Sequence, residues 1–115
     1  MKAILMTAKG QPDVLNYEEV KEPEISSPSQ IKVKLQAAGV NPIDTKIRKN
    51  GILYDHPLPV ILGCDGAGII VETGSGVTKF KVGDEIWFFH GGLGQEQGNY
   101  ARFDSCASNL ASILN

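Results

Sequence analysis

The chain has 115 residues, of which 42% are apolar and 21% charged, a composition typical of one globular domain with a modest core. Its formal net charge of -2 offers no attraction to nucleic acid or anionic lipid, so both partner classes are excluded. No apolar run is long enough to span a bilayer or to serve as a signal peptide, and the two cysteines form no disulfide framework. These features predict a cytoplasmic protein.

The first thirty residues predict a small β unit followed by a loop. Residues 1–9 and 14–20 have the apolar and polar mixture of strands, and Gln11, Pro12 and Asp13 predict the turn between them. Residues 21–30 contain two prolines among Glu and Ser, which favours a surface loop.

Residues 31–50 predict a strand followed by a short helix. Apolar and polar residues alternate over 31–37, which indicates one buried and one exposed face. Asn41 and Pro42 then have the chemistry of a helix start, with a capping side chain before a residue that needs no N–H partner. Asp44 stands where a capping-box acid is expected, so we predict a helix over 43–50 that stops at the following glycine.

Residues 60–89 are the densest ordered stretch, and they predict a β-hairpin. A β-branched run at 69–71 and a returning strand at 82–89 flank Gly74 and Gly76, which favour a tight reversal with positive φ angles. Three earlier glycines indicate a sharp bend or a close approach of another group. They are Gly63, Gly66 and Gly68.

The remaining segments predict loops and two short strands. Residues 52–59 read as an extended loop, and the glycine-rich stretch 90–98 reads as a mobile one. Strands are expected at 100–103 and 110–114. Many short strands with one short helix predict a barrel or a sandwich.

Most generic chemical motifs are weak in this sequence. The soft metal ligands are His56, Cys64, His90 and Cys106, and none forms the close pair that zinc sites usually contain. The two glycines around Ala67 lack the third glycine of a dinucleotide-binding loop. We therefore predict no metal site and no complete cofactor loop.

Asn41 is the most informative polar residue. It can cap the helix that begins at Pro42, or its carboxamide can orient a flat ligand through donor and acceptor together. The two roles are compatible if the backbone and the side chain divide the work.

Three segments resemble a known family in their order and spacing. Residues 37–51, 58–87 and 98–103 are similar to the front part of medium-chain dehydrogenase/reductases, most of all to their zinc-independent quinone oxidoreductase and zinc-type alcohol dehydrogenase-like branch. The resemblance extends from Met1 to about Leu110. It implies a mainly β, GroES-like, partly open β-barrel with one or two short helices. Residues 1–115 would be the N-terminal part of the catalytic domain, and the Rossmann cofactor domain would be absent from this chain.

The resemblance also implies which residues form the site. Zinc-using relatives would present a cysteine in place of Asn41 and a histidine in place of Cys64, which argues against zinc here. Asn41 would contact the nicotinamide end of NADPH and the acceptor carbonyl, and Asp44 would cap the helix. The other implied contacts are Pro42 and Thr45 near the cofactor, and Lys46, Tyr54 and Cys64 on the substrate side.

The implied reaction is hydride transfer from NADPH to a small-molecule quinone or to an activated alkene or carbonyl. The whole enzyme would be a homodimer formed through the missing domain, and these 115 residues alone would be inactive. Two alternatives stay open. One is a GroES-like interaction or co-chaperonin-type module without catalysis, and the other is a zinc-dependent alcohol dehydrogenase domain with unusual ligands.

Overall fold

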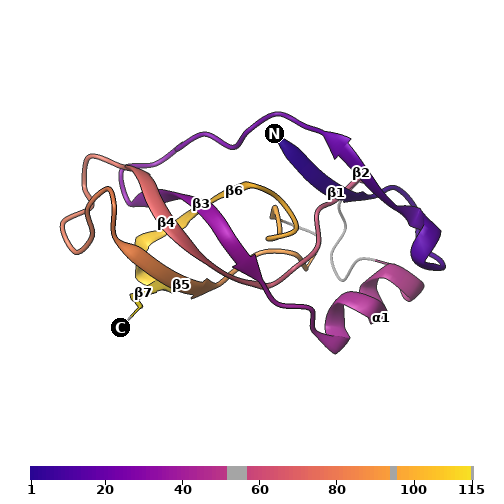
Figure 1. Ribbon diagram of the computed structural model, residues 1–115. Helices are drawn as coiled ribbons and strands as arrows, with labels where there is room; N and C mark the ends of the chain where they lie inside the picture. Colours follow the sequence, from indigo (N-terminus) through magenta and orange to yellow (C-terminus); the bar gives the residue numbers. More distant parts are fainter. Residues whose placement is uncertain (52–56, 94–95, 115) are drawn as a thin grey trace.

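The computed structural model describes residues 1–51, 57–93 and 96–114, and its architecture is mainly β (Figure 1). Strands β1 (Lys2–Met6) and β2 (Leu15–Glu19) pair in a small antiparallel sheet. A second, antiparallel sheet has the order β6-β3-β4-β5-β7. Its strands are β3 (Gln30–Ala38), β4 (Asp65–Thr73), β5 (Glu85–Phe89), β6 (Phe103–Ala107) and β7 (Ala111–Ile113).

One α-helix accompanies these strands. Helix α1 (Pro42–Asn50) and the small sheet lie at one end of the molecule, and β7 lies at the other (Figure 1). Two single turns of 3-10 helix, η1 (Pro12–Val14) and η2 (Ser108–Leu110), complete the elements. In the described part of the chain neither sheet closes on itself, which confirms the predicted mainly β, partly open fold. No helix in the same part is long and apolar enough to cross a membrane.

The larger sheet buries one face in an apolar cluster. Ile31 and Val33 of β3 are fully buried, whereas Lys34, the residue after Val33, is exposed. The alternation predicted for 31–37 is therefore confirmed in the first half of the strand. Side chains from the other strands of this sheet, and Phe80 from the connection between β4 and β5, complete the cluster. These are Ile70, Phe80, Ile86, Phe88, Cys106 and Ala111.

A second apolar cluster fixes the helix against the small sheet. Met6 of β1, Ile47 of α1, and Val60 and Leu62 of the segment before β4 are buried together. Met6 and Val60 also exchange two backbone hydrogen bonds, at 2.8 and 3.1 Å. The segment that leads into β4 is therefore clamped between the helix and β1.

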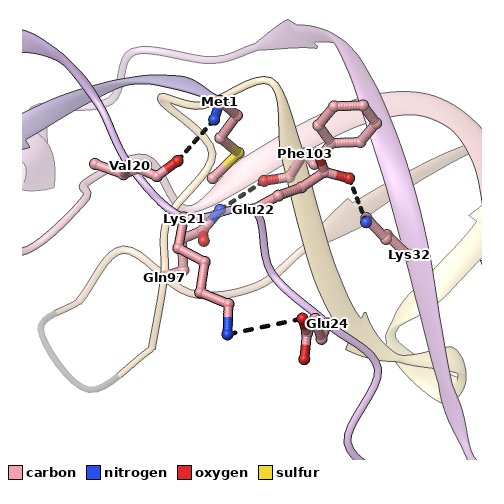
Figure 2. Close-up of polar contacts among 8 residues, drawn as sticks. All are labelled: Met1, Val20, Lys21, Glu22, Glu24, Lys32, Gln97 and Phe103. Atoms are coloured by element: carbon pink, nitrogen blue, oxygen red, sulfur yellow. Dashed lines mark hydrogen bonds and ion pairs between the residues drawn. The ribbon is translucent and has the colours of Figure 1, made fainter.

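Polar contacts hold the chain between β2 and β3 near the larger sheet. Figure 2 shows that the amino terminus of Met1 donates to the Val20 carbonyl at 2.6 Å, and that Glu22 pairs with Lys32 of β3. In the same view Gln97 Nε2 donates to the Phe103 carbonyl at 2.6 Å, at the start of β6. The predicted surface loop at 21–30 thus has defined contacts with β3.

The central hairpin is confirmed, and Gly74 and Gly76 lie in a turn in which the Val77 N–H donates to the Gly74 carbonyl at 3.1 Å. The positive φ angles expected at these glycines are wrong. β4 pairs antiparallel with β5, from Asp65 opposite Phe89 to Ile69 opposite Glu85. The second strand starts at Glu85 rather than Val82, and positive φ occurs at Gly83 (98°), not at Gly74 or Gly76.

The glycine at 74 is instead needed for close packing. The connection runs back toward the segment before β3, and a Cβ atom on Gly74 would lie 2.3 Å from the Pro28 carbonyl oxygen. The earlier glycines fit the prediction of close approach. A Cβ on Gly68 would lie 2.1 Å from the Lys34 carbonyl oxygen, and Gly63 has φ of 100°.

One other sequence prediction needs adjustment, and two are only partly covered by the described residues. The strand expected at 100–103 begins only at Phe103, because the segment before it forms a single bridge between Ala101 and Ala3. The predicted extended loop at 52–59 and the predicted mobile loop at 90–98 fall partly outside the described residues, so both stay predictions. In the described part of the second, Gly98 donates to the Ile61 carbonyl at 2.9 Å.

Candidate functional site

The site begins at the turn from β3 into α1. Asn41 has extended backbone angles (φ -117°, ψ 155°) and Pro42 opens the helix, as expected of an N-cap followed by proline. The Asp44 carboxylate accepts the backbone N–H of Asn41 at 2.8 Å, so the predicted capping role of Asp44 is confirmed. Gly51 ends the helix with φ of 108°. The backbone of the turn is therefore fixed by its own sequence.

A second carboxylate holds this turn from the side of β4. Asp65, the first residue of β4, accepts the backbone N–H of Gly39 at 2.6 Å and the Asn41 side-chain Nδ2 at 3.1 Å, through different oxygens. A Cβ atom on Gly39 would lie 2.2 Å from Asp65 Oδ1, so only glycine permits this approach. The carboxylate of Asp65 thus links the end of β3 to the start of β4.

Cys64 lies on the inner side of the same turn. Its side chain is buried, and its Sγ lies 3.7 Å from Asn41 Nδ2. Burial raises the pKa of the Cys64 thiol, and the negative charges of Asp44 and Asp65 raise it further. Cys64 therefore stays a neutral thiol near pH 7 and is a weaker nucleophile than a thiolate.

Tyr100 completes the network from a distant part of the chain. Its hydroxyl donates to Asp44 Oδ2 at 2.7 Å, across 56 positions of sequence. Burial raises the pKa of Tyr100 well above its ordinary range, and the hydrogen bond to Asp44 adds to this effect. The hydroxyl therefore remains a donor near neutral pH. The other Asp44 oxygen, Oδ1, is buried and has no partner among the described residues.

The structure brings some of the predicted site residues together and leaves others apart. Asn41 and Cys64 meet at the centre of the network. Thr45 donates its hydroxyl to the Pro42 carbonyl at 2.8 Å within the first turn of α1, and both residues are exposed, as is Lys46. Tyr54 lies outside the described residues.

Sequence reasoning assigned no role to Tyr100 or Gly39. The Gly39 contact had a visible signal, a glycine shortly before the candidate Asn41, but nothing in the sequence indicated its partner. Tyr100 had no local signal, because its contact with Asp44 depends on the tertiary fold.

An apolar groove of about 460 Å³ adjoins the site. Its outer wall includes Trp87 and Phe89 of β5, which are 51% and 62% exposed, and Asp65 and Gly39 join it to the network around Asn41. The remaining lining residues are small or buried: Ala37, Ala38, Gly66, Ala67 and Phe88. The arrangement therefore offers a flat apolar surface beside a hydrogen-bonding carboxamide.

The acidic groups here do not form a recognisable cation site. Across residues 1–51, 57–93 and 96–114, no three His, Cys, Asp or Glu side chains are placed to hold a metal ion. Asp44 and Asp65 instead accept hydrogen bonds from Asn41, Gly39 and Tyr100.

Comparisons with known proteins agree with the earlier resemblance. A quinone oxidoreductase of Pseudomonas aeruginosa is 43% identical over 94 residues, which are 81% of this chain and 28% of that protein. An Arabidopsis thaliana NADPH-dependent alkenal/one oxidoreductase is 40% identical over 89 residues, 76% of this chain and 23% of that protein. The chain thus spans about a quarter of the length of these two relatives.

A solved structure and a family model give the same assignment. The structure of Escherichia coli quinone oxidoreductase complexed with NADPH has a TM-score of 0.85 and 33% identity, covering 100% of this chain and 33% of that one. The family model described as the alcohol dehydrogenase GroES-like domain matches residues 27–111. The chain therefore belongs to the medium-chain dehydrogenase/reductase family and carries its alcohol dehydrogenase GroES-like domain.

Proposed function

We propose that this chain is the catalytic-domain part of an NADPH-dependent, zinc-independent oxidoreductase that transfers a hydride to a quinone or to an activated alkene or carbonyl. The named activities of the relatives, which include quinone and alkenal reduction, support this reaction class. NADPH is supported by the complex of the Escherichia coli relative with that cofactor. The cytoplasmic location and a homodimer formed through a cofactor domain stay predictions.

The observation that carries the proposal is the Asn41 carboxamide beside an apolar groove, with its side chain held by Asp65 and its backbone held by Asp44. NADPH supplies the hydride when it is bound, so the protein has to orient the cofactor and the acceptor and exclude water. We assign Asn41 to the nicotinamide end of the cofactor, with Pro42 and Thr45 beside it. Cys64, Lys46 and Tyr54 would line the acceptor side.

Zinc independence is supported by the chemistry of the residues at the turn. Zinc in proteins is held by Cys, His, Asp or Glu side chains, and the carboxylates at this turn already accept hydrogen bonds from Gly39, Asn41 and Tyr100. Asn41 is a carboxamide that already donates toward Cys64 and Asp65. The donor set around Asn41 thus fits an amide-bearing organic ligand better than a metal ion.

The most direct test joins this chain to a cofactor domain. In a chimera, the 115 residues replace the matching third of Escherichia coli quinone oxidoreductase, and NADPH oxidation is measured with quinone and alkenal acceptors. We expect reduction of at least one acceptor, and Asn41→Ala should lower kcat/KM about 100-fold through misplacement of the reacting groups. Asn50→Ala, on the exposed end of the same helix, is the matched control. A folded chimera without reductase activity would contradict the proposal.

The 115 residues alone should bind NADPH more weakly than micromolar. Gly66 and Gly68 lie inside strand β4, whereas dinucleotide-binding glycines belong to a turn between a strand and a helix. Isothermal titration calorimetry of NADPH into the isolated chain measures this directly. Micromolar binding would show that the phosphates have a site that we have not recognised.

A further inference from the structure

The hydrogen-bonding capacity of Asn41 is used unequally. A carboxamide nitrogen carries two hydrogens, and its oxygen carries two lone pairs. Nδ2 of Asn41 points at two acceptors of the protein, Asp65 Oδ2 at 3.1 Å and Cys64 Sγ at 3.7 Å. Both hydrogens are directed into the protein, and the oxygen faces the backbone N–H of Asp44 in the capping box. Since the oxygen carries two lone pairs, the capacity left for a ligand is its second lone pair.

The surroundings of Asp65 make this orientation the stable one. An ionised carboxylate only accepts hydrogen bonds, and the other Asp65 oxygen is already engaged by the backbone of Gly39 at 2.6 Å. Rotating the Asn41 amide by half a turn would place its oxygen against a carboxylate oxygen. The rotated form would exchange an attraction for a repulsion between two acceptors.

The two carboxylates near Asn41 therefore have separate tasks. Asp44 binds the backbone N–H of Asn41 and fixes the helix start. Asp65 binds the side-chain amide and fixes which of its two ends is available. Only the second task bears on what the site can recognise.

We propose that Asp65 is a positioning residue that holds the Asn41 carboxamide with its oxygen available, so that the site recognises a ligand through that ligand's own N–H donor. This inference rests on the proposed function in one respect: it takes the ligand group to be the primary carboxamide of a nicotinamide. A quinone carbonyl has no such hydrogen, so Asn41 would position the cofactor and not polarise the acceptor.

The orientation can be tested on the 115-residue chain without any ligand. With asparagine labelled in ¹⁵N, proton exchange of the Asn41 side-chain amide should be about tenfold or more slower than at exposed Asn50 and Asn109, since one bond is to a charged group. Asn99 is the positive control, because its Nδ2 donates to the carbonyls of Gly63 and His90. Exchange at Asn41 as fast as at Asn50 would overturn the proposal, whatever the activity of the protein.

A substitution separates positioning from a general structural role. Asp65→Asn keeps the size of the side chain but allows either amide orientation, so exchange at Asn41 should approach that of the exposed residues. Asp84→Asn is the matched control, because Asp84 accepts one backbone N–H, from Lys81, in the turn before β5. Unchanged slow exchange at Asn41 in a folded Asp65→Asn variant would also overturn the proposal. The wild-type measurement decides the orientation even if this variant does not fold.

The ligand class is tested with three small probes that differ in their donors. Nicotinamide has an N–H donor, 3-acetylpyridine replaces the amide nitrogen with a methyl group, and hydroquinone carries the donor of a reduced acceptor. We expect nicotinamide to shift the Asn41 signals with a Kd about fivefold lower than that of 3-acetylpyridine, the effect of one hydrogen bond. In Asp65→Asn the ratio should fall to about one, and in Asp84→Asn it should persist.

The remaining outcomes of the probe experiment also decide the assignment. Equal affinity for the two pyridines, or no shift with either, would overturn nicotinamide as the ligand. If only hydroquinone shifted the Asn41 signals, the hydrogen-bond donor that Asn41 recognises would belong to the reduced acceptor and not to the nicotinamide. Failure of the chimera to reduce quinones would instead reject the proposed activity and leave the orientation of Asn41 intact.

Discussion

Two buried aspartates in this small domain differ in how many donors the fold gives them. Asp44 is 4% exposed and Asp104 is 1% exposed, and each has one carboxylate oxygen without a partner among the described residues. The second oxygen of Asp44 accepts from Asn41 and Tyr100. Among the described residues, the second oxygen of Asp104 accepts one hydrogen bond, from the adjacent backbone N–H of Ser105 at 2.8 Å.

The position of each aspartate explains this difference. Asp44 lies in the first turn of α1, where free backbone N–H groups and the helix dipole favour a negative charge. Asp104 lies in the middle of β6, opposite Val33, where the backbone groups are used by the sheet. Burial raises the pKa of Asp104 from 3.8 to about 8, against a smaller opposing effect of the Ser105 hydrogen bond. The two aspartates are both buried, but their backbone surroundings supply different numbers of hydrogen-bond donors.

The largest expected effect is on the pH dependence of the free energy of unfolding when Asp104 is replaced by a neutral side chain. The folded state keeps this proton up to about pH 8, whereas the unfolded chain loses it near pH 4, so stability falls as pH rises between these values. We expect the free energy of unfolding to drop by about 3 kcal/mol from pH 5 to pH 8. Asp104→Asn should remove most of this drop, and urea unfolding at several pH values measures it.

The matched control for Asp104 is Asp84→Asn, since Asp84 also accepts one backbone N–H but is not fully buried. This variant should keep the pH dependence of the wild type. If Asp104→Asn also kept the pH dependence of the wild type, another group would cause that dependence. The contrast between Asp104 and Asp44 would then be wrong.

Removing the Asp44 carboxylate should have the second largest effect. Asp44→Ala deletes the acceptor of the Asn41 N–H and leaves the Tyr100 hydroxyl without its partner. We expect a loss of about 2 kcal/mol in the free energy of unfolding, measured by urea denaturation. Asp13→Ala, at an exposed turn, is the control and should cost much less. A loss at Asp44 no larger than at Asp13 would show that its donors contribute nothing to stability.

The capping role of Asp44 was predicted from the sequence, whereas the burial of Asp104 was not. The helix start at Asn41 and Pro42 and the acid at Asp44 are a local pattern, in which each residue acts on backbone within one turn. Asp104 lies just beyond the strand predicted at 100–103, so neither its place in β6 nor the register that turns its side chain inward was predicted.

The same distinction applies to the rest of the fold and the site. Alternation at 31–37 predicted the strand, and Gly63, Gly66 and Gly68 predicted the close approaches. The positive φ expected at Gly74 was wrong, and this glycine instead permits a close contact with Pro28, a partner that spacing along the chain cannot reveal. Likewise, Asn41 could be singled out from its own turn, but its contacts with Asp65 and Cys64 join separate strands.

The smallest expected effect isolates one donor of Asp44. Tyr100→Phe removes the hydroxyl and keeps the ring, which lies against Gly63. Because Asp44 retains the Asn41 N–H, we expect a loss of only about 1 kcal/mol in the free energy of unfolding. The raised pKa of Tyr100 keeps its hydroxyl protonated, so this loss should be constant between about pH 6 and pH 9. Tyr17→Phe, at an exposed ring, should show no loss. If urea denaturation gave equal losses for Tyr100→Phe and Tyr17→Phe, the Tyr100 hydroxyl would contribute nothing to stability as a second donor to Asp44.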